Sequence, residues 1–409
     1  MIKKRILVVS NSPQIIQGSG GRTRIVYEIK EIIAPTVETR LFCFVNLKYY
    51  FQYKKLIKAK KQLEIDTGVK VIYSPSLPTF HGLLDNLVNF INCISIFVYS
   101  LFWKCNSYYA QGISAAFPII LLKKTILPIK LITDVHGVLP EEHFYKNSSF
   151  NDLEFQKLGL KEKQVLECSD LIFLVSNRLF EHYKLKYSLN LSNSLVVPCL
   201  TNYQSESPPL NSTCTPSLLN DINNDRLIFT YVGSFRQYQL VDQTFETFLK
   251  IKSKIQNAYF LIITNHVSNF ENKAREQNIS DSDYKIVSIN QNEVQNYLHY
   301  TDIGFLLRDN SIVNKVASPT KFAEYLMAGV PVITTNFVGD YSSIVKTKRI
   351  GYVIENLEIL DDNLFLFINE YINNKQEYKK RAFNFANDNL TWDSYKLLIP
   401  EYLRKYEII

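Results

Sequence analysis

The stretch that decides the fold of this 409-residue chain reads SPTKFAEYLMAG from Ser318 to Gly329 and continues into the apolar run Val330–Thr334. Ser318 is expected to cap a helix, with Pro319 at the first helical position and Gly329 at the end, because these residue types favour those places. A β-branched apolar run directly after a short helix predicts a buried strand. The stretch therefore predicts one helix–strand unit of a parallel α/β sheet.

The same helix offers a candidate phosphate site at its N-terminus. The backbone N–H groups near Thr320 and Lys321 are free to bind an anion there, and the Lys321 ammonium adds a positive charge. Thr320 and Glu324 are spaced i, i+4, so they share one face and are ~6 Å apart along the axis. This is roughly the offset between the phosphates and the ribose of a nucleotide. An ordinary surface helix carries such residues too, so the stretch alone leaves both interpretations open.

Short β-branched runs alternate with helical patterns along the whole chain, which predicts parallel sheets flanked by helices. In the first half, strands are expected at 6–9, 38–45, 69–74, 107–110, 129–134, 171–175 and 195–197. In the second half, they are expected at 228–232, 258–264, 285–288, 303–307, 330–334 and 352–353. A stretch rich in Ser, Pro, Asn and Thr separates the halves. We therefore predict an α/β protein with domains at 1–204 and 225–390, a linker or exposed loop at 205–224, and a helical segment at 391–409.

Composition narrows the function classes. The length suits two domains, and 46% hydrophobic with 21% charged residues excludes a disordered chain. The net charge of +7 is too modest for a protein that wraps nucleic acid, so no nucleic-acid partner is expected. Six scattered cysteines without a C-x-x-C motif predict neither a metal site nor a disulfide framework. The N-terminus runs directly into the strand 6–9 and is too short for a signal peptide, which predicts a cytoplasmic location.

Two segments of the first half bear on membrane contact. Leu83–Trp103 is strongly apolar, but its uninterrupted part, Ile96–Trp103, is far shorter than the ~20 residues of a membrane span. A buried or interfacial amphipathic helix is therefore expected. Lys48–Lys61 holds six lysines among aromatic residues, which suits a lipid headgroup surface. An ordinary solvated helix is the alternative. Docking would place the protein at the inner face of the plasma membrane.

Two motifs of the first half are candidates for ligand contact. The loop from Gly18 to Thr23 brings Gly20 and Gly21 before a helix expected at 25–33, where backbone N–H groups can approach an anion. A simple flexible loop is equally consistent with these residues. His136 in the segment DVHG follows a buried strand, and ligands of open α/β sheets collect at the carboxyl ends of strands. The imidazole can bond a sugar hydroxyl, or it can simply hold the loop.

Two further segments lie in the second half. In Tyr231–Gln239, Gly233 permits close backbone approach and Arg236 is a candidate phosphate ligand. Asp281-Ser-Asp283 matches a metal-binding D-x-D pattern only superficially, because its place in a polar turn favours a solvated turn.

Taken together and in this order, these segments resemble the retaining glycosyltransferases of family 4, which have the GT-B fold. The resemblance covers nearly the whole chain and is strongest over SPTKFAEYLMAGVPVITT. It is also good at Glu167–Ser176, and within the family it is nearest to enzymes of bacterial surface polysaccharides. It implies two Rossmann-like domains facing across a cleft. The second would bind a nucleotide-diphosphate sugar, expected to be a UDP-sugar, and the first a lipid-linked glycan acceptor.

The resemblance also implies roles for individual residues. Glu324 would bind the donor ribose, and the helix start would hold the diphosphate. His136 would bond the donor sugar, so that His136, Lys321 and Glu324 form the catalytic set. The other residues expected at the nucleotide-sugar are Gly20, Gly21, Arg22, Gly233, Arg236, Ser288, Arg308, Ser318 and Thr320. No metal and no cofactor are expected, because the helix dipole and cations would stabilise the leaving diphosphate.

The chain departs from the family pattern at three positions. Val316 stands where a Glu is common, eight residues before Glu324, and Ser234 and Gln239 stand at about the places of an Arg and a Lys. Arg236, Lys321 or Arg308 would then supply the positive charge. These departures keep two alternatives open, a non-catalytic scaffold subunit of a polysaccharide-synthesis complex and a sugar-nucleotide epimerase of the same fold.

Overall fold

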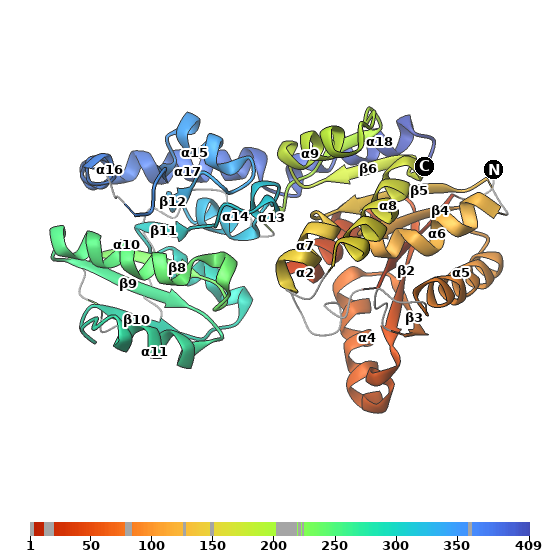
Figure 1. The fold of residues 1–409 in the computed structure, drawn as a ribbon, viewed down its shortest axis with the longest axis horizontal. Coiled ribbons are helices and arrows are strands. Elements are labelled where there is room, and N and C mark those ends of the chain that lie inside the picture. The colour runs from red at the N-terminus through yellow and green to blue at the C-terminus, as the bar shows by residue number, and fades with distance from the viewer. Residues whose placement is uncertain are drawn as a thin grey trace. The chain divides into compact units, whose positions relative to one another are not determined.

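A computed structural model describes residues 4–11, 20–77, 84–125, 128–147, 151–201, 219, 222, 225–358 and 362–409. The chain divides into two compact units, which we describe separately (Figure 1). Unit 1 comprises Met1–Pro198 and Trp392–Ile409, and unit 2 comprises Cys199–Thr391. Most of the predicted linker 205–224 lies outside the described residues.

Unit 1 is built on a seven-stranded sheet in the order β3-β2-β1-β4-β5-β6-β7, with every neighbouring pair parallel. Its strands are β1 (Arg5–Ser10), β2 (Glu38–Asn46), β3 (Lys70–Ser76), β4 (Ser107–Gln111), β5 (Lys130–Val135), β6 (Leu171–Leu174) and β7 (Ser194–Val196). Its helices are α2 (Gly20–Tyr27), η1 (Glu28–Ile33), α3 (Ala34–Thr36), η2 (Leu47–Gln52), α4 (Tyr53–Thr67), α5 (Leu84–Trp103), α6 (Ile113–Thr125), α7 (Leu139–Lys146), α8 (Asp152–Cys168), α9 (Asn177–Tyr187), η6 (Asp393–Tyr395) and α18 (Leu398–Lys405).

Unit 2 is built on a six-stranded parallel sheet in the order β10-β9-β8-β11-β12-β13. Its strands are β8 (Leu227–Val232), β9 (Ala258–Ile263), β10 (Tyr284–Val287), β11 (Ile303–Leu306), β12 (Val332–Thr335) and β13 (Gly351–Ile354). Its helices are η4 (Gln237–Gln239), α10 (Val241–Lys254), α11 (Val267–Glu276), η5 (Gln291–Glu293), α12 (Val294–Leu298), α13 (Ile312–Lys315), α14 (Thr320–Met327), α15 (Tyr341–Lys348), α16 (Asp362–Asn373) and α17 (Lys375–Asn389).

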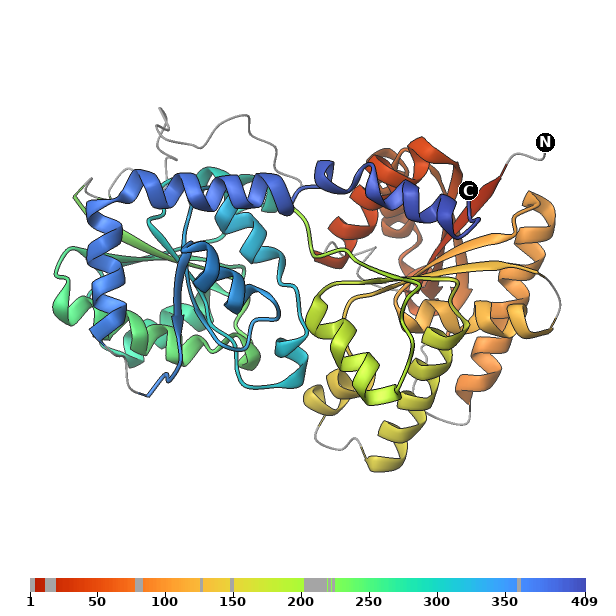
Figure 2. The same cartoon turned by 90° about the horizontal axis from the view of Figure 1, so that it is seen from above.

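The prediction of an α/β fold with parallel sheets is confirmed. Each of the thirteen strand segments expected from the sequence overlaps one of the strands β1–β13. Helices cover both faces of each sheet (Figure 1 and Figure 2), so the strands are buried on both sides. Every residue of β8 and of β9 is buried, for example. Such strands appear in a sequence as short continuous apolar runs.

The C-terminal segment Trp392–Ile409 is part of unit 1, where Figure 2 shows its helix α18 against the rest of that unit. Ile399 and Leu403 of α18 are fully buried, as is Ile408. Ser107 of β4 donates a hydrogen bond to the Ile408 carbonyl at 3.5 Å. Unit 1 is thus completed by residues that follow unit 2 in the sequence.

Candidate functional site

Helix α14 begins one residue later than expected. The predictions that Ser318 caps the helix and that Pro319 is its first residue are both wrong, because Thr320 is the first helical residue and Pro319 is the N-cap, which makes no side-chain bond to the helix. Pro319 is extended (φ −68°, ψ 126°), so Ser318 lies one residue too early to cap. Its buried hydroxyl instead pairs with the Tyr341 hydroxyl at 2.7 Å and accepts a hydrogen bond from the Cys199 amide at 2.8 Å. Ser318 therefore fixes the loop before α14.

Two aromatic rings of α14 hold the helix in unit 2. The ring of Phe322 stacks on that of Tyr341, with centroids 3.9 Å apart. The buried Tyr325 hydroxyl accepts the Val232 amide at 2.9 Å and donates to the Thr230 carbonyl at 3.0 Å. Since Thr230 and Val232 belong to β8, these bonds fix the position of α14 relative to an inner strand of the sheet.

Lys321 and Glu324 are brought into direct contact on the first turn of α14. The Lys321 ammonium donates to the Glu324 carboxylate at 2.7 Å, and the side chains are 25% and 14% exposed. Thr320, the first helical residue, is half-buried. Gln295 of α12 donates to the Glu324 carbonyl at 3.1 Å. Three predicted ligand residues thus lie together at one accessible helix start, with two of them paired to each other.

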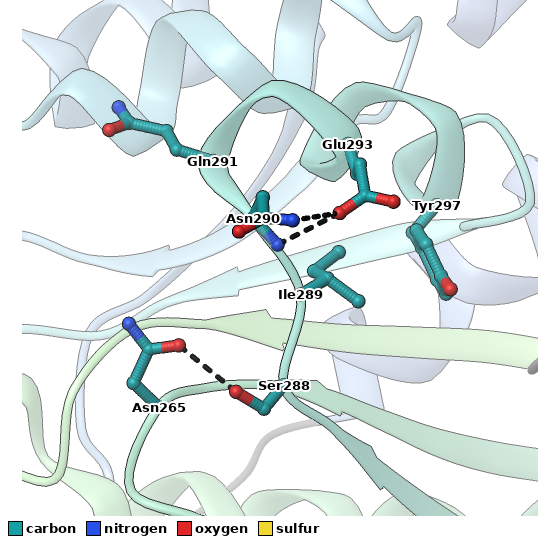
Figure 3. Close-up of a pocket in the computed structure, with 7 residues that line it drawn as sticks. All are labelled: Asn265, Ser288, Ile289, Asn290, Gln291, Glu293 and Tyr297. Carbon is teal, nitrogen blue, oxygen red and sulfur yellow. Dashed lines mark hydrogen bonds between the residues drawn. The ribbon is translucent and has the colours of Figure 1, made fainter.

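A polar cavity of about 590 Å³ lies at the carboxyl ends of β9 and β10 (Figure 3). Its lining residues are Asn265, Ser288, Ile289, Asn290, Gln291, Glu293 and Tyr297. Ser288 donates to Asn265 at 3.2 Å, and Asn290 donates to Glu293 from its amide (3.1 Å) and its side chain (2.8 Å). Carboxyl ends of parallel strands are where open α/β sheets bind ligands. Helix α12 joins the cavity to α14, since Tyr297 lines the cavity and Gln295 bonds the Glu324 carbonyl.

The turn after β8 is closed by hydrogen bonds among its own side chains. Tyr231 donates to the Gln239 side-chain oxygen at 2.6 Å, and Gln239 donates to the Ser234 hydroxyl at 2.9 Å. A Cβ on Gly233 would lie 2.3 Å from that Gln239 oxygen and 2.8 Å from the Tyr231 hydroxyl. A side chain at position 233 would therefore displace Gln239 or Tyr231 and disturb their hydrogen bond. Ser234 and Gln239, which stand in place of the expected cations, are partners of each other.

The three cations expected to supply charge differ in how accessible they are. Arg308 is buried after β11, and burial lowers its pKa; its guanidinium donates to the Leu307 carbonyl at 2.7 Å. Lys321 is paired with Glu324. Arg236 is exposed at the end of the β8 turn. Val316 is 1% exposed beside α13, a site that would be costly for a Glu carboxylate.

In unit 1, His136 is held by a buried ion pair that sequence reasoning missed. The imidazole Nε2 lies 2.6 Å from Asp134 Oδ2, and Asp134 is the penultimate residue of β5. Arg24 of α2 donates to both Asp134 oxygens at 2.8 Å and to the Pro198 carbonyl at 2.8 Å. Burial opposes ionisation of Asp134, yet Arg24 and His136 hold its pKa below the usual range. The sequence signal that could have indicated this ion pair is an Asp near the end of a buried strand, Asp134, two residues before His136.

A second buried carboxyl lies beside this pair. Glu28 accepts hydrogen bonds from the Tyr109 hydroxyl and, at 3.1 Å, from the Gln111 amide. Burial, together with the nearby charge of Asp134, raises the pKa of Glu28 to about 7. The interior of unit 1 next to His136 therefore holds one ionised carboxyl and one that titrates near neutrality.

The glycine segment is helical earlier than expected. The prediction of a loop followed by a helix at 25–33 is wrong in its boundary, because α2 begins at Gly20 and continues as the π-helix η1 over 28–33. Gly20 and Gly21 thus form the first turn of α2, while 18–19 lie outside the described residues. Arg22 pairs with Asp66 of α4. The helix turns Arg24, rather than Arg22, toward Asp134.

Asp281-Ser-Asp283 lies in a turn in which Asp281 and Ser282 are exposed, whereas the Asp283 side chain is only 18% exposed. Asp283 pairs with Arg226 at 3.0 Å and with Lys252 at 2.8 Å. Within the described part of the chain, no group of three or more His, Cys, Asp or Glu side chains is arranged to hold a metal ion.

Residues 220–385 match the family model described as glycosyl transferases group 1. A comparison with curated proteins finds no match. Among solved structures, the chain is similar to sucrose-phosphate synthase from Thermosynechococcus elongatus (14% identity, 98% of this chain and 99% of that chain covered, TM-score 0.71). It is also similar to a glycosyltransferase from Rickettsia africae, with 17% identity, 100% of this chain and 99% of that chain covered, and a TM-score of 0.70. A third similar structure is HepE from Anabaena in complex with UDP, with 12% identity, 98% of this chain and 100% of that chain covered, and a TM-score of 0.69.

The structural likeness spans both units and identifies the GT-B fold, and the sequence match over most of unit 2 identifies the enzyme class. The chain is a glycosyltransferase with the GT-B fold.

Proposed function

We propose that this glycosyltransferase is a retaining enzyme of family 4 that transfers a sugar from a UDP-sugar to a lipid-linked glycan. The pathway would be the synthesis of a bacterial surface polysaccharide, in the cytoplasm at the inner face of the plasma membrane. The observation that carries the proposal is the Lys321–Glu324 pair on the first turn of α14, joined through α12 to the cavity at Ser288. HepE, which shares the fold, has been solved with UDP and with UDP-glucose, and WaaG, another such protein, acts in lipopolysaccharide biosynthesis.

In the proposed mechanism, unit 2 binds the nucleotide diphosphate. The cavity at Ser288 takes the base, Glu324 accepts hydrogen bonds from the ribose hydroxyls, and the amides at Thr320 and Lys321 bind the diphosphate. As the bond from the sugar to the diphosphate breaks, negative charge grows on the leaving oxygen. The positive end of α14 and the Lys321 ammonium stabilise that charge, with no metal required. Arg236, the exposed cation of the three candidates, is assigned to the same diphosphate.

Unit 1 contributes His136 in this proposal. Because its Nε2 is bonded to Asp134, Nδ1 is the ring nitrogen available to a hydroxyl of the donor sugar. Asp134 and Arg24 keep the imidazole in one orientation, so the hydrogen bond costs little rotamer entropy on binding. Gly20, Gly21 and Arg22 on the first turn of α2 are assigned to the diphosphate or the acceptor.

The test is a calorimetric titration of the full chain with UDP, GDP, CDP and ADP in EDTA. We expect UDP to bind most tightly without a divalent metal, and lack of any binding at millimolar concentration would contradict the proposal. NMR of the glycoside product decides the stereochemistry, because a retaining enzyme leaves the anomeric configuration of the donor unchanged. An inverted product would refute the assignment to a retaining family.

A non-catalytic scaffold is the second candidate, and a specific observation favours it. Ser234 and Gln239 are bonded to each other in the turn where cations were expected, and Val316 is buried. A scaffold would keep its partner binding in the double variant Glu324→Ala, Lys321→Ala and show no turnover in the wild type. An epimerase would convert its nucleotide-sugar in the absence of any acceptor.

A further inference from the structure

The loop that carries His136 is held by residues of α8 and α9 that the site described above does not include. Only residues 136–138 separate β5 from α7. Each residue has two rotatable backbone torsions, so a loop of this length has little freedom to move at one position alone. On the side of the strand, Asp134 lies 2.6 Å from the His136 imidazole. The contacts on the side of the helix determine how the backbone of the loop is placed.

Glu162 of α8 is the centre of the contacts on the helix side. Its carboxylate is fully buried and accepts hydrogen bonds from groups of α7 and α9. These donors include the Leu139 amide (2.8 Å), the Tyr183 hydroxyl (2.9 Å), the Tyr187 hydroxyl (2.7 Å) and the Lys186 ammonium (3.1 Å). Leu139 is the first residue of α7, where an amide has no carbonyl partner inside its own helix. Glu162 therefore fixes the start of α7, where the His136 loop ends.

Lys186 of α9 joins the three helices at one point. Its ammonium lies 2.7 Å from the carboxylate of Glu141 on α7 and 3.1 Å from that of Glu162 on α8. A displacement of Glu162 would leave several polar groups inside the protein without partners, which is costly. The cluster around Glu162 therefore gives the loop a fixed reference inside unit 1.

Tyr183 connects Glu162 to the loop itself. The rings of Tyr183 and Tyr187 are one turn apart on α9 and stack with centroids 6.0 Å apart. Both hydroxyls bond Glu162, but that of Tyr183 also lies 2.8 Å from the Gly137 carbonyl, so its proton is shared between two acceptors. Within the described part of unit 1, Tyr187 makes no such bond to the loop. Since Gly137 directly follows His136, Tyr183 holds the peptide group next to the imidazole-bearing residue.

We propose that Tyr183, anchored on Glu162, is a positioning residue for His136. The inference deepens the proposed function and rests on it, since that function assigns the imidazole to the donor sugar. Asp134 sets the rotation of the ring, and Tyr183 sets the backbone from which the ring extends. The His136 side chain is 33% exposed, whereas Tyr183 is fully buried and acts only through the loop. A catalytic group misplaced by about 1 Å can cost a factor of about 10² in rate.

The experiment compares Tyr183→Phe with its matched control, Tyr187→Phe, in the full chain. Each change removes one hydroxyl donor to Glu162 and keeps the stacked ring, but only Tyr183→Phe removes the contact with Gly137. The first readout is the imidazole signal of His136 in NMR spectra of protein labelled at histidine, assigned by its loss in His136→Ala. The second is kcat and KM for the release of UDP from UDP-glucose, with urea unfolding as the check on folding.

We expect Tyr183→Phe to shift and broaden the His136 signal and to lower kcat about tenfold with little change in KM. Tyr187→Phe should leave the signal and kcat unchanged, although both variants should lose a comparable part of their resistance to urea. Because Tyr183 acts through His136, Tyr183→Phe should lower kcat no further when it is added to His136→Ala.

Equal effects of the two tyrosine variants on the His136 signal would overturn the inference, because they would reflect only the loss of a bond to Glu162. An unmoved signal in Tyr183→Phe, or a tenfold loss of kcat that persists in the His136→Ala background, would overturn it as well. Failure of the proposed function is recognised separately. Full turnover in His136→Ala would remove the imidazole from the donor sugar, while the NMR signal still decides whether Tyr183 positions the ring.

Discussion

Arg24 and Asp134, 110 residues apart in the chain, meet inside unit 1 through two hydrogen bonds of 2.8 Å from one guanidinium to the two oxygens of one carboxylate. Their side chains are 3% and 0% exposed. The pair is fully desolvated, so each charge depends on the other. Because Asp134 also contacts His136, this ion pair connects the stability of unit 1 to the geometry of the candidate site.

Breaking this pair from one side should be strongly destabilising. We expect Arg24→Met to lower the free energy of unfolding by about 3–5 kcal/mol at pH 7, because it leaves an unpaired buried carboxylate. The matched control is Arg22→Met, which removes the partly exposed pair with Asp66 two residues earlier and should cost about 1 kcal/mol or less. Urea unfolding measures both. Equal losses of unfolding free energy in the two variants would show that the buried Arg24–Asp134 pair stabilises the protein no more than the partly exposed Arg22–Asp66 pair.

His136 should affect turnover more than donor affinity. We expect His136→Ala to lower kcat by about 10²-fold or more while UDP-sugar affinity changes little, since the proposed function places the imidazole at the reacting sugar. His143→Ala, on α7, is the control. Unchanged turnover in His136→Ala, measured with saturating donor, would remove His136 from the site.

Glu28 should make stability depend on pH near neutrality. Its pKa is raised from 4.5 to about 7 by burial, so between these values the folded protein holds a proton that the unfolded chain has released. Stability from this group is therefore present below about pH 4.5 and is lost as the pH rises through about 7. When the pH is raised from 5 to 8, the free energy of unfolding of the wild type should fall by about 1–3 kcal/mol relative to that of Glu28→Gln.

The comparison with Glu28→Gln removes contributions from groups that titrate in both proteins. Asp134 does not interfere, because its lowered pKa moves its contribution below pH 3.8. Parallel stability profiles of the two proteins from urea unfolding at several pH values would show that Glu28 is ionised in the folded state.

Glu324 and Lys321 should be coupled in donor binding. Glu324→Gln should weaken UDP affinity by about 1–3 kcal/mol through loss of charge-assisted hydrogen bonds to ribose. Lys321→Gln alone should also weaken it, and the double variant should lose less than the sum, because each residue is the other's partner at 2.7 Å. Glu355→Gln, which breaks an exposed pair with Lys346, is the control. Strict additivity in calorimetry would mean that the contact has no role in binding.

Gly233→Ala should destabilise unit 2 by about 1–3 kcal/mol, because the new Cβ would overlap the Gln239 side-chain oxygen. Adding Gln239→Ala should relieve part of the loss, whereas adding Ala at the distant, exposed Gln256 should not. Thermal unfolding measures each variant. No relief in the double variant would indicate that the clash with the Tyr231 hydroxyl dominates.

The strands were predictable because parallel strands buried on both faces must be apolar along their length, as in Phe229–Val232. Short helices at strand ends were predictable for a similar reason, since residues such as Pro319 and Gly329 restrict the backbone locally. The α14 site followed because Thr320, Lys321 and Glu324 are close in sequence, and helix geometry alone places them together.

Contacts between distant residues were not predictable from a single sequence. Nothing near Arg24 indicates that it pairs with Asp134, because the pairing depends on how α2 packs against β5. Ser318 was misassigned because capping preference is weaker than its bonds to Tyr341 and Cys199. The sequence also did not predict which face of α5 is buried, since its periodicity shows which residues share a face but not which of the faces packs on the sheet.

The segment Trp392–Ile409 completes unit 1 although unit 2 precedes it in the sequence. During translation, unit 2 can therefore finish folding while the hydrophobic sites for Ile399 and Leu403 are still empty. Unit 1, whose first residues leave the ribosome before those of unit 2, is therefore the last to complete its hydrophobic core. A nascent chain stopped after Thr391 would carry a folded unit 2 and an unfinished unit 1, a species that chaperones or proteases would recognise by its exposed apolar surface.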